Sequence, residues 1–143
     1  MGGSCSPQRQ ADETLPAIAV ENWPYVPATM RVHPLSRVVP SAEPGTPPHA
    51  EVCVQCLDLD GDATRGVGEL SVQVGAEGER VRRNLGDAAV NRASWDPVTR
   101  TYRLQLPVPP GFQCGAGASL PVQAWLQITP TRQLQATSNI GCP

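Results

Sequence analysis

The sequence predicts an all-β fold: an antiparallel β-sandwich of about seven to eight short strands, with an immunoglobulin-like or C2-like arrangement. Three observations support this prediction. Apolar and polar residues alternate in several short runs, turn-forming residues separate the runs, and no capped segment of helical length repeats its apolar positions every 3.6 residues. The 16 Pro and 13 Gly among 143 residues also disfavour long helices, because Pro removes a backbone donor and Gly weakens regular elements.

The chain length fits one domain with a tail. We place the boundary near Pro27, where a polar segment gives way to alternating residues. Residues 1–26 are expected to form a flexible, mostly irregular N-terminal tether, and residues 27–143 the β-sandwich domain.

The first strand is expected around Met30, because Met30 and Val32 alternate with polar residues. Pro34 ends backbone pairing on one side of this strand, which is typical of an edge position. The proline-rich segment 39–49 is too long for a hairpin turn. We therefore expect it to pass between the two sheets.

The next two strands flank an acidic loop, and each is expected to have one buried and one solvent-exposed face. In the first, Val52, Val54 and Cys56 alternate with Glu51, Cys53 and Gln55. In the second, Leu70, Val72 and Val74 alternate with Ser71 and Gln73.

A short strand over 79–84 carries Arg80, Arg82 and Arg83 around Val81. Three arginines so close together could bind phosphate or carboxylate. A solvated strand or hairpin tip is the simpler interpretation, and the one we favour.

The C-terminal third holds the clearest alternation. Asp96 and Pro97 have the chemistry of a turn, which leads into a strand over 102–108. After a loop over 109–117, two further strands over 120–128 and 134–140 are joined by a turn at 129–132.

Trp125 falls on the polar face of its strand, beside Gln123 and Gln127. An exposed aromatic ring among amides is how sugar-binding faces are often built. Packing of Trp125 against a neighbouring loop is the interpretation we favour.

Two of the five cysteines, Cys53 and Cys56, have the spacing of a zinc or redox pair. On an alternating strand, however, residues three apart point to opposite faces, which disfavours a shared metal ion or a mutual disulfide. We expect Cys56 to be a small buried apolar residue, and Cys53 to be a surface thiol or a partner in another pairing.

Cys114 and Cys142 are the predicted disulfide. If Ile128 lies opposite Gln133 in the C-terminal hairpin, Cys142 falls opposite Ser119, where the loop carrying Cys114 can reach it. Closing such a loop contributes about 3 to 4 kcal/mol in the chain-entropy model. Exchanged pairings with Cys53 and Cys56 remain open.

The acidic loop has the spacing of a calcium site and resembles an EF-hand loop. Asp58, Asp60 and Asp62 are candidates for the first, third and fifth ligands, Thr64 for a backbone carbonyl ligand at the seventh position, and Glu69 for the bidentate twelfth. Oxygen ligands at alternate loop positions suit Ca2+, which binds six to eight of them.

Several features depart from that pattern. Ala63 stands where the sharp bend needs a glycine, Arg65 brings positive charge, and the flanking segments are strands. The alternative is a polar loop that joins two strands, with Arg65 as an internal counter-ion.

Other function classes have less support. The formal charge of −2 argues against nucleic-acid binding, and no apolar run approaches the roughly 20 residues that span a bilayer. The two histidines, His33 and His49, lie in no catalytic motif, and we expect both at the surface.

Gly2, Gly3 and Ser4 precede Cys5 as small residues precede the acylated cysteine of a bacterial lipoprotein, although no charged and apolar leader stands before them. Cys5 is therefore a candidate lipidation site, and a free thiol in an irregular segment is the alternative. Any membrane contact is expected only through this lipid.

Residues 30–37 (MRVHPLSR), followed by 60–62 (DGD) and 101–104 (TYRL), resemble segments of uncharacterised secreted lipoproteins of high-GC bacteria. This resemblance implies an envelope-anchored β-sandwich and transfers no catalytic residues. The expected function is a non-enzymatic, extracytoplasmic module of the cell envelope with a structural or binding role. The alternatives are a calcium-dependent adhesion or carbohydrate-binding domain that uses the loop 58–69, and a small hydrolase or redox protein that uses Cys53 and Cys56. The sequence identifies no protein or carbohydrate partner.

Overall fold

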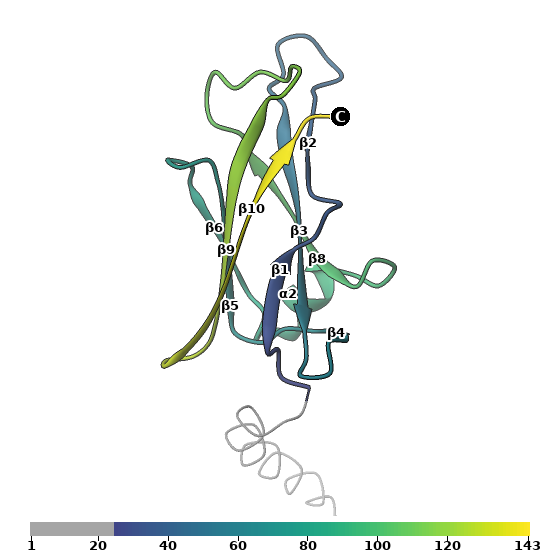
Figure 1. Ribbon diagram of the computed structural model, residues 1–143, viewed down its shortest axis with the longest axis vertical. Coiled ribbons are helices and arrows are strands. Elements are labelled where there is room, and N and C mark those ends of the chain that lie inside the picture. Colours follow the sequence, from purple (N-terminus) through teal and green to yellow (C-terminus); the bar gives the residue numbers. More distant parts are fainter. Residues whose placement is uncertain (1–24) are drawn as a thin grey trace, which may run out of the picture.

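The computed structural model describes residues 25–143, which form two antiparallel sheets packed face to face (Figure 1). The β3 sheet contains β1 (Thr29–Val32), β2 (Arg37–Val39), β3 (His49–Leu57), β4 (Ala63–Thr64), β7 (Trp95–Asp96) and β8 (Thr101–Pro107). The β9 sheet contains β5 (Glu69–Val74), β6 (Arg80–Asn84), β9 (Ser119–Thr129) and β10 (Arg132–Gly141). The predicted antiparallel β-sandwich is confirmed.

The connectivity is that of an immunoglobulin-like sandwich. The β9 sheet has the order β10-β9-β5-β6, and the β3 sheet runs β1-β3-β8-β7, with β2 and β4 also paired to β3. The strands can be given the letters of the Greek key if β1 and β2 together count as strand A. Strands B and E are then β3 and β8 in one sheet, and strands C, C′, F and G are β5, β6, β9 and β10 in the other.

β1 and β2 form one broken strand along the edge of β3. Met30 pairs with Cys56 and Val38 pairs with Ala50, so both halves follow the same partner. Pro34 lies in the break, as the edge prediction required. The Ser36 hydroxyl bridges the gap, because it accepts from the Cys53 amide at 2.8 Å and donates to the Cys53 carbonyl at 3.2 Å.

The predicted course of the proline-rich segment is wrong. Residues 40–48 join β2 to β3, which are neighbours in one sheet, and do not cross the sandwich. The chain instead crosses between the sheets after Thr64, on its way from β4 to β5. The three-residue β2 is too short for its alternation to be recognised in the sequence.

The core lies between the sheets and confirms the predicted alternation. Its fully buried side chains come from the inward positions of both sheets and include Val52, Val54, Cys56, Leu70, Val72, Tyr102, Val122, Ala124 and Leu126.

Cys53 is not the surface thiol that its outward position predicts. Only 1% of the residue is exposed, because Ser36, Thr101 and Arg103 lie around it on the outer face of the β3 sheet. Cys53 and Cys56 are both free and buried, on opposite faces of β3.

One short helix, α2 (Ala88–Ser94), precedes β7 and was not predicted. The Asp87 carboxylate caps it by accepting from the amides of Ala89 and Val90, the usual role of Asp at a helix N-terminus. None of its residues is fully buried, so its amphipathic signal is weak. No helix within residues 25–143 has the length and apolar character of a bilayer-crossing segment.

A hydrogen-bonded cluster attaches α2 to the sandwich. The buried Tyr102 hydroxyl accepts from the Gly66 amide at 2.7 Å and donates to Asn91 Oδ1 at 2.9 Å. Asn91 in turn donates to the carbonyls of Gly66 and Leu85. This cluster fixes the segment that leaves the acidic loop.

The C-terminal hairpin carries a one-residue bulge that shifts the predicted register. Arg132 pairs with Thr129, but Gln133 then pairs with Gln127, so Ile128 has no direct partner. Gly141 therefore lies opposite Ser119, the place predicted for Cys142.

Cys114 and Cys142 form the predicted disulfide, with their Cα atoms 5.6 Å apart. Neither is available as a zinc ligand. Such a bond indicates an oxidising, extracytoplasmic environment.

Candidate functional site

The acidic loop closes on its own backbone. Asp58 is only 7% exposed, and its Oδ1 accepts from the amides of Asp60 at 2.9 Å and Asp62 at 3.0 Å. The Asp58 amide also donates to the Asp62 carbonyl, and Gly61 adopts a φ of 86°, which a glycine tolerates best. Asp58 thus serves as the structural acceptor of a tight turn between β3 and β4.

Two of the other predicted calcium ligands, Thr64 and Glu69, belong to strands that follow this turn. The Thr64 hydroxyl donates to the Tyr25 carbonyl at 3.2 Å, and Glu69 belongs to β5 in the opposite sheet. Within residues 25–143, no three His, Cys, Asp or Glu side chains are close enough to hold a metal ion. The five predicted ligands therefore do not converge in this structure.

Arg65 is not the counter-ion of the acidic loop. Its guanidinium donates to Asn91 Oδ1 at 3.1 Å and lies 4.9 Å from the centroid of the Trp95 ring. The side chain supports the Tyr102 cluster instead. Local hydrogen bonds to the Asp58 carboxylate and between backbone groups hold the loop together, and Arg100 donates to the Ala63 carbonyl at 2.7 Å.

A second candidate is the outward face of the β9 sheet, which we call the amide face. Its side chains form three cross-strand rows, each running from β10 to β6: Gln133, Gln127, Glu69 and Asn84; Gln135, Trp125, Ser71 and Arg82; Thr137, Gln123, Gln73 and Arg80. Amide and hydroxyl groups dominate these rows, and each both donates and accepts hydrogen bonds.

Hydrogen bonds hold three of the glutamines in one orientation. Gln135 donates to Gln133 at 3.1 Å, and Gln133 donates to Gln127 at 2.9 Å. Gln127 completes the chain by donating to the carbonyls of Thr129 and Arg132. Each of these hydrogen bonds uses one N–H donor or one oxygen acceptor of a side-chain amide. The amide groups that are not used in this way face solvent, and the bonds fix their orientation.

Trp125 lies at the centre of the face, under an arginine. Its cross-strand neighbour Ser71 is only 5% exposed, and the Arg80 guanidinium carbon lies 3.7 Å from the centroid of the indole. Since Arg80 belongs to β6 and Trp125 to β9, the two side chains meet above the intervening β5 and cover Ser71. The sequence placed Trp125 correctly on the polar face; its partner is an arginine of a strand, not a loop.

The two outer faces of the sandwich differ in how their charges are paired. The salt bridges found within residues 25–143 all lie on the β3 sheet: Arg103 to Glu51 at 2.7 Å, Arg103 to Asp96 at 3.0 Å and Arg37 to Glu51 at 3.9 Å. The hydrogen bond to Glu51 raises the pKa of Arg103. The hydrogen bond that the Val98 backbone amide donates to Asp96 lowers the pKa of that carboxyl group.

The arginines of the amide face have no such partners. Arg80 and Arg82 are exposed, and neither has a carboxylate within 4.0 Å in the part of the chain that the structure describes. The amide face therefore carries two arginines without a carboxylate contact beside an aromatic ring, and one carboxylate, Glu69, in a row of its own. On the β3 sheet, Arg37 and Arg103 pair with Glu51 and Asp96, whereas Arg31 donates to Gln55 Oε1 at 2.8 Å and has no carboxylate within 4.0 Å among residues 25–143.

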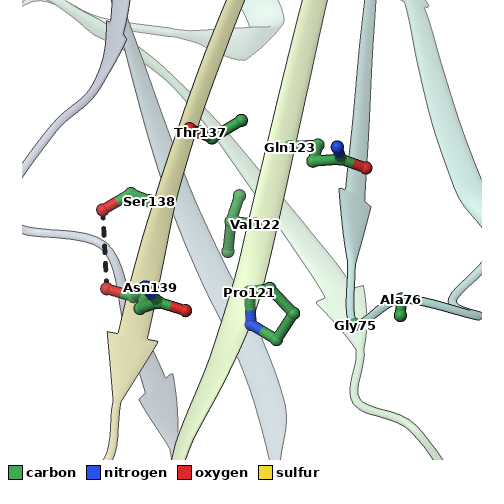
Figure 2. A pocket seen from close by; sticks show the side chains of 8 residues that line it. All are labelled: Gly75, Ala76, Pro121, Val122, Gln123, Thr137, Ser138 and Asn139. Carbon is green, nitrogen blue, oxygen red and sulfur yellow. Dashed lines mark hydrogen bonds between the residues drawn. The ribbon is translucent and has the colours of Figure 1, made fainter.

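An open hollow of about 510 Å³ lies at one end of the amide face (Figure 2). Figure 2 shows Gln123 extending from β9 toward β5, with Thr137 and Asn139 on the neighbouring β10. Gly75 and Ala76, just after β5, complete this end of the face. The side chains of Gln123, Thr137 and Asn139 bring amide and hydroxyl groups to the lining of the hollow.

The remaining predicted site residues offer little chemistry. Burial raises the pKa of Cys56 to about 12 and also raises that of Cys53, so neither thiol is a ready nucleophile. His33 is tied to a turn, because its Nδ1 accepts from the Leu35 amide. Cys5 lies outside the described residues.

No protein-family model, curated protein or solved structure matches this chain.

Proposed function

We propose that this protein is a non-enzymatic binding module of the cell envelope and that the amide face is its contact surface. The observation that carries the proposal is the contrast between the two outer faces. The β3 sheet pairs Arg37 and Arg103 with Glu51 and Asp96, whereas the amide face presents hydrogen-bonded amides, Trp125 and two arginines that have no carboxylate within 4.0 Å among residues 25–143. An aromatic ring with adaptable hydrogen-bonding groups around it is a typical binding surface.

Two observations support a binding role over catalysis. Both free thiols, Cys53 and Cys56, are buried and have raised pKa values. The hydroxyl of Tyr102 is buried and hydrogen-bonded to its neighbours at Gly66 and Asn91, which is a structural role.

The envelope location rests on the disulfide and on Cys5. The bond between Cys114 and Cys142 suits an oxidising compartment, and a lipid on Cys5 would tether the sandwich to a membrane. Intact-mass measurement of the native protein tests this part, since acylation adds the mass of fatty chains at Cys5.

The binding role is tested by co-sedimentation of the full-length protein with delipidated envelope from the producing cells. Cys5→Ser in every variant removes any contribution of a lipid. We expect this protein to sediment with the envelope material, and the added Trp125→Ala to abolish most of the sedimentation. Trp125 is solvent-facing and its contact with Arg80 is worth about 0.5 to 1 kcal/mol, so the variant is expected to fold.

The matched control is Arg37→Gln, which changes an exposed side chain on the opposite face. It is expected to sediment like the parent protein. Sedimentation that survives Trp125→Ala, or that is lost in Arg37→Gln, would place the contact surface elsewhere. A parent protein that remains fully soluble would contradict the binding role itself.

A further inference from the structure

We infer that the amide face binds a polysaccharide that contains uronic acid residues, with Trp125 stacking on a sugar ring and Arg80 and Arg82 pairing with sugar carboxylates. This inference rests on the proposed function and names the ligand class of the same face. It follows from the charge of the face, from the position of the aromatic ring and from the hydrogen-bonding groups along the strands.

The charge of the face favours an acidic ligand. Arg80 and Arg82 project from the same side of β6, two residues and thus about 7 Å apart. Neither has a carboxylate within 4.0 Å among residues 25–143, and the two arginines outnumber Glu69, the one carboxylate in the rows of the amide face. A guanidinium group matches a carboxylate with two parallel hydrogen bonds.

The aromatic ring favours a sugar as the bearer of that carboxylate. One face of a pyranose ring consists largely of C–H groups and packs well on an indole. In this structure the Arg80 guanidinium occupies that place, 3.7 Å from the Trp125 centroid. A uronate can exchange the cation–π contact for a charge-assisted pair with Arg80, which leaves the indole free for the sugar ring.

The rest of the face matches the hydroxyl groups of further sugar units. Gln123 and Thr137 border the hollow at one end, while the hydrogen-bonded chain from Gln135 to Gln127 lies at the other. From Pro121 to Gln127 strand β9 spans about 20 Å, which is room for several sugar units in a row.

Arg80 is thus expected to act in opposite directions on acidic and neutral sugars. For a uronate it supplies the pairing charge, whereas for a neutral sugar it only covers the ring that the sugar needs. A binding experiment with two ligands that differ only in charge separates these effects.

The experiment titrates the full-length protein with hexagalacturonate and with its fully methyl-esterified form, by calorimetry and by tryptophan fluorescence. We expect the acid to bind at least fivefold more tightly than the ester, with a preference that weakens as salt rises. Arg80→Gln with Arg82→Gln should weaken acid binding about three- to tenfold and leave ester binding unchanged or tighter. Arg37→Gln serves as the control for the loss of an arginine and should retain both affinities.

The fluorescence change should disappear in Trp125→Ala, while Trp95, which packs on Tyr102, should not respond. Equal affinity for acid and ester, or acid binding that survives the double arginine variant, would overturn the inference. So would the absence of binding to either oligosaccharide. If envelope sedimentation still depends on Trp125 in that case, the proposed function stands and only its ligand class is wrong, for example because an acidic protein surface is the true partner.

Discussion

The disulfide between Cys114 and Cys142 gives the most quantitative prediction for stability. It joins the loop before β9 to the residue just after β10 and thereby attaches the C-terminus to the sandwich. Reduction, or the double substitution Cys114→Ser and Cys142→Ser, is expected to leave the strands intact. The main effect is on the unfolded chain, which gains freedom when the cross-link is absent.

The sequence separation of 28 sets the size of the effect. In the chain-entropy model, a closed loop of that length removes about 12 cal/mol/K from the unfolded state, which corresponds to about 3.6 kcal/mol at 25 °C. A domain of roughly 120 residues has an unfolding entropy of about 0.25 kcal/mol/K near its midpoint. The melting temperature is therefore expected to fall by about 14 °C.

Urea unfolding followed by circular dichroism, with and without reductant, measures the loss directly. The double serine variant is the control, because reductant should not change its stability further. A loss below about 1 kcal/mol on reduction, or a reductant effect that persists in the serine variant, would refute this account of the bond.

Three further predictions concern the interior and the turns. Tyr102→Phe should lower the unfolding free energy by about 1 to 3 kcal/mol in a urea titration, because both partners of the buried hydroxyl lose their bond; an unchanged midpoint would contradict this. The backbone amide of Val98 holds the pKa of Asp96 below its ordinary 3.8, so the stabilisation from Asp96 is present above about pH 4 and is lost as the pH falls through the lowered pKa. Asp96→Asn should accordingly flatten the acid limb of the stability profile, and a profile identical to wild type would disprove that role. Cys53 and Cys56 should resist iodoacetamide at pH 8 in the native protein and react in denaturant without reductant, as read by peptide mass; modification of either in the native state would show that the β3 sheet opens there.

The fold was predictable because alternation reports directly which side of a strand is buried. Runs such as Leu70, Val72 and Val74 need only their local pattern to be assigned. The alternation of polar and apolar residues also indicated the observed register of the β9–β10 hairpin. Pairing Gln133 with Gln127 puts polar opposite polar, whereas the predicted pairing with Ile128 did not, so the alternation itself favoured a bulge.

The burial of Cys53 and the partner of Trp125 could not be derived in this way. Cys53 is covered by Ser36 from a break in the edge strand and by Arg103 from β8, which are remote in sequence. Arg80 reaches Trp125 only because β6 and β9 flank the same strand. Such contacts depend on strand order, which local sequence patterns do not specify. The spacing of the acidic loop likewise did not show that the Asp58 carboxylate accepts hydrogen bonds from its own turn.

An NMR map of the side-chain amides, with soluble envelope polysaccharide as the ligand, tests whether the amide face is the contact surface. If the amide face is the contact surface, the resonances of Gln123, Gln127 and Gln135 and the indole of Trp125 should shift together as ligand is added. Shifts confined to Gln55 and the charged residues of the β3 sheet, with the amide face unchanged, would show that the contact surface lies on the opposite side of the sandwich.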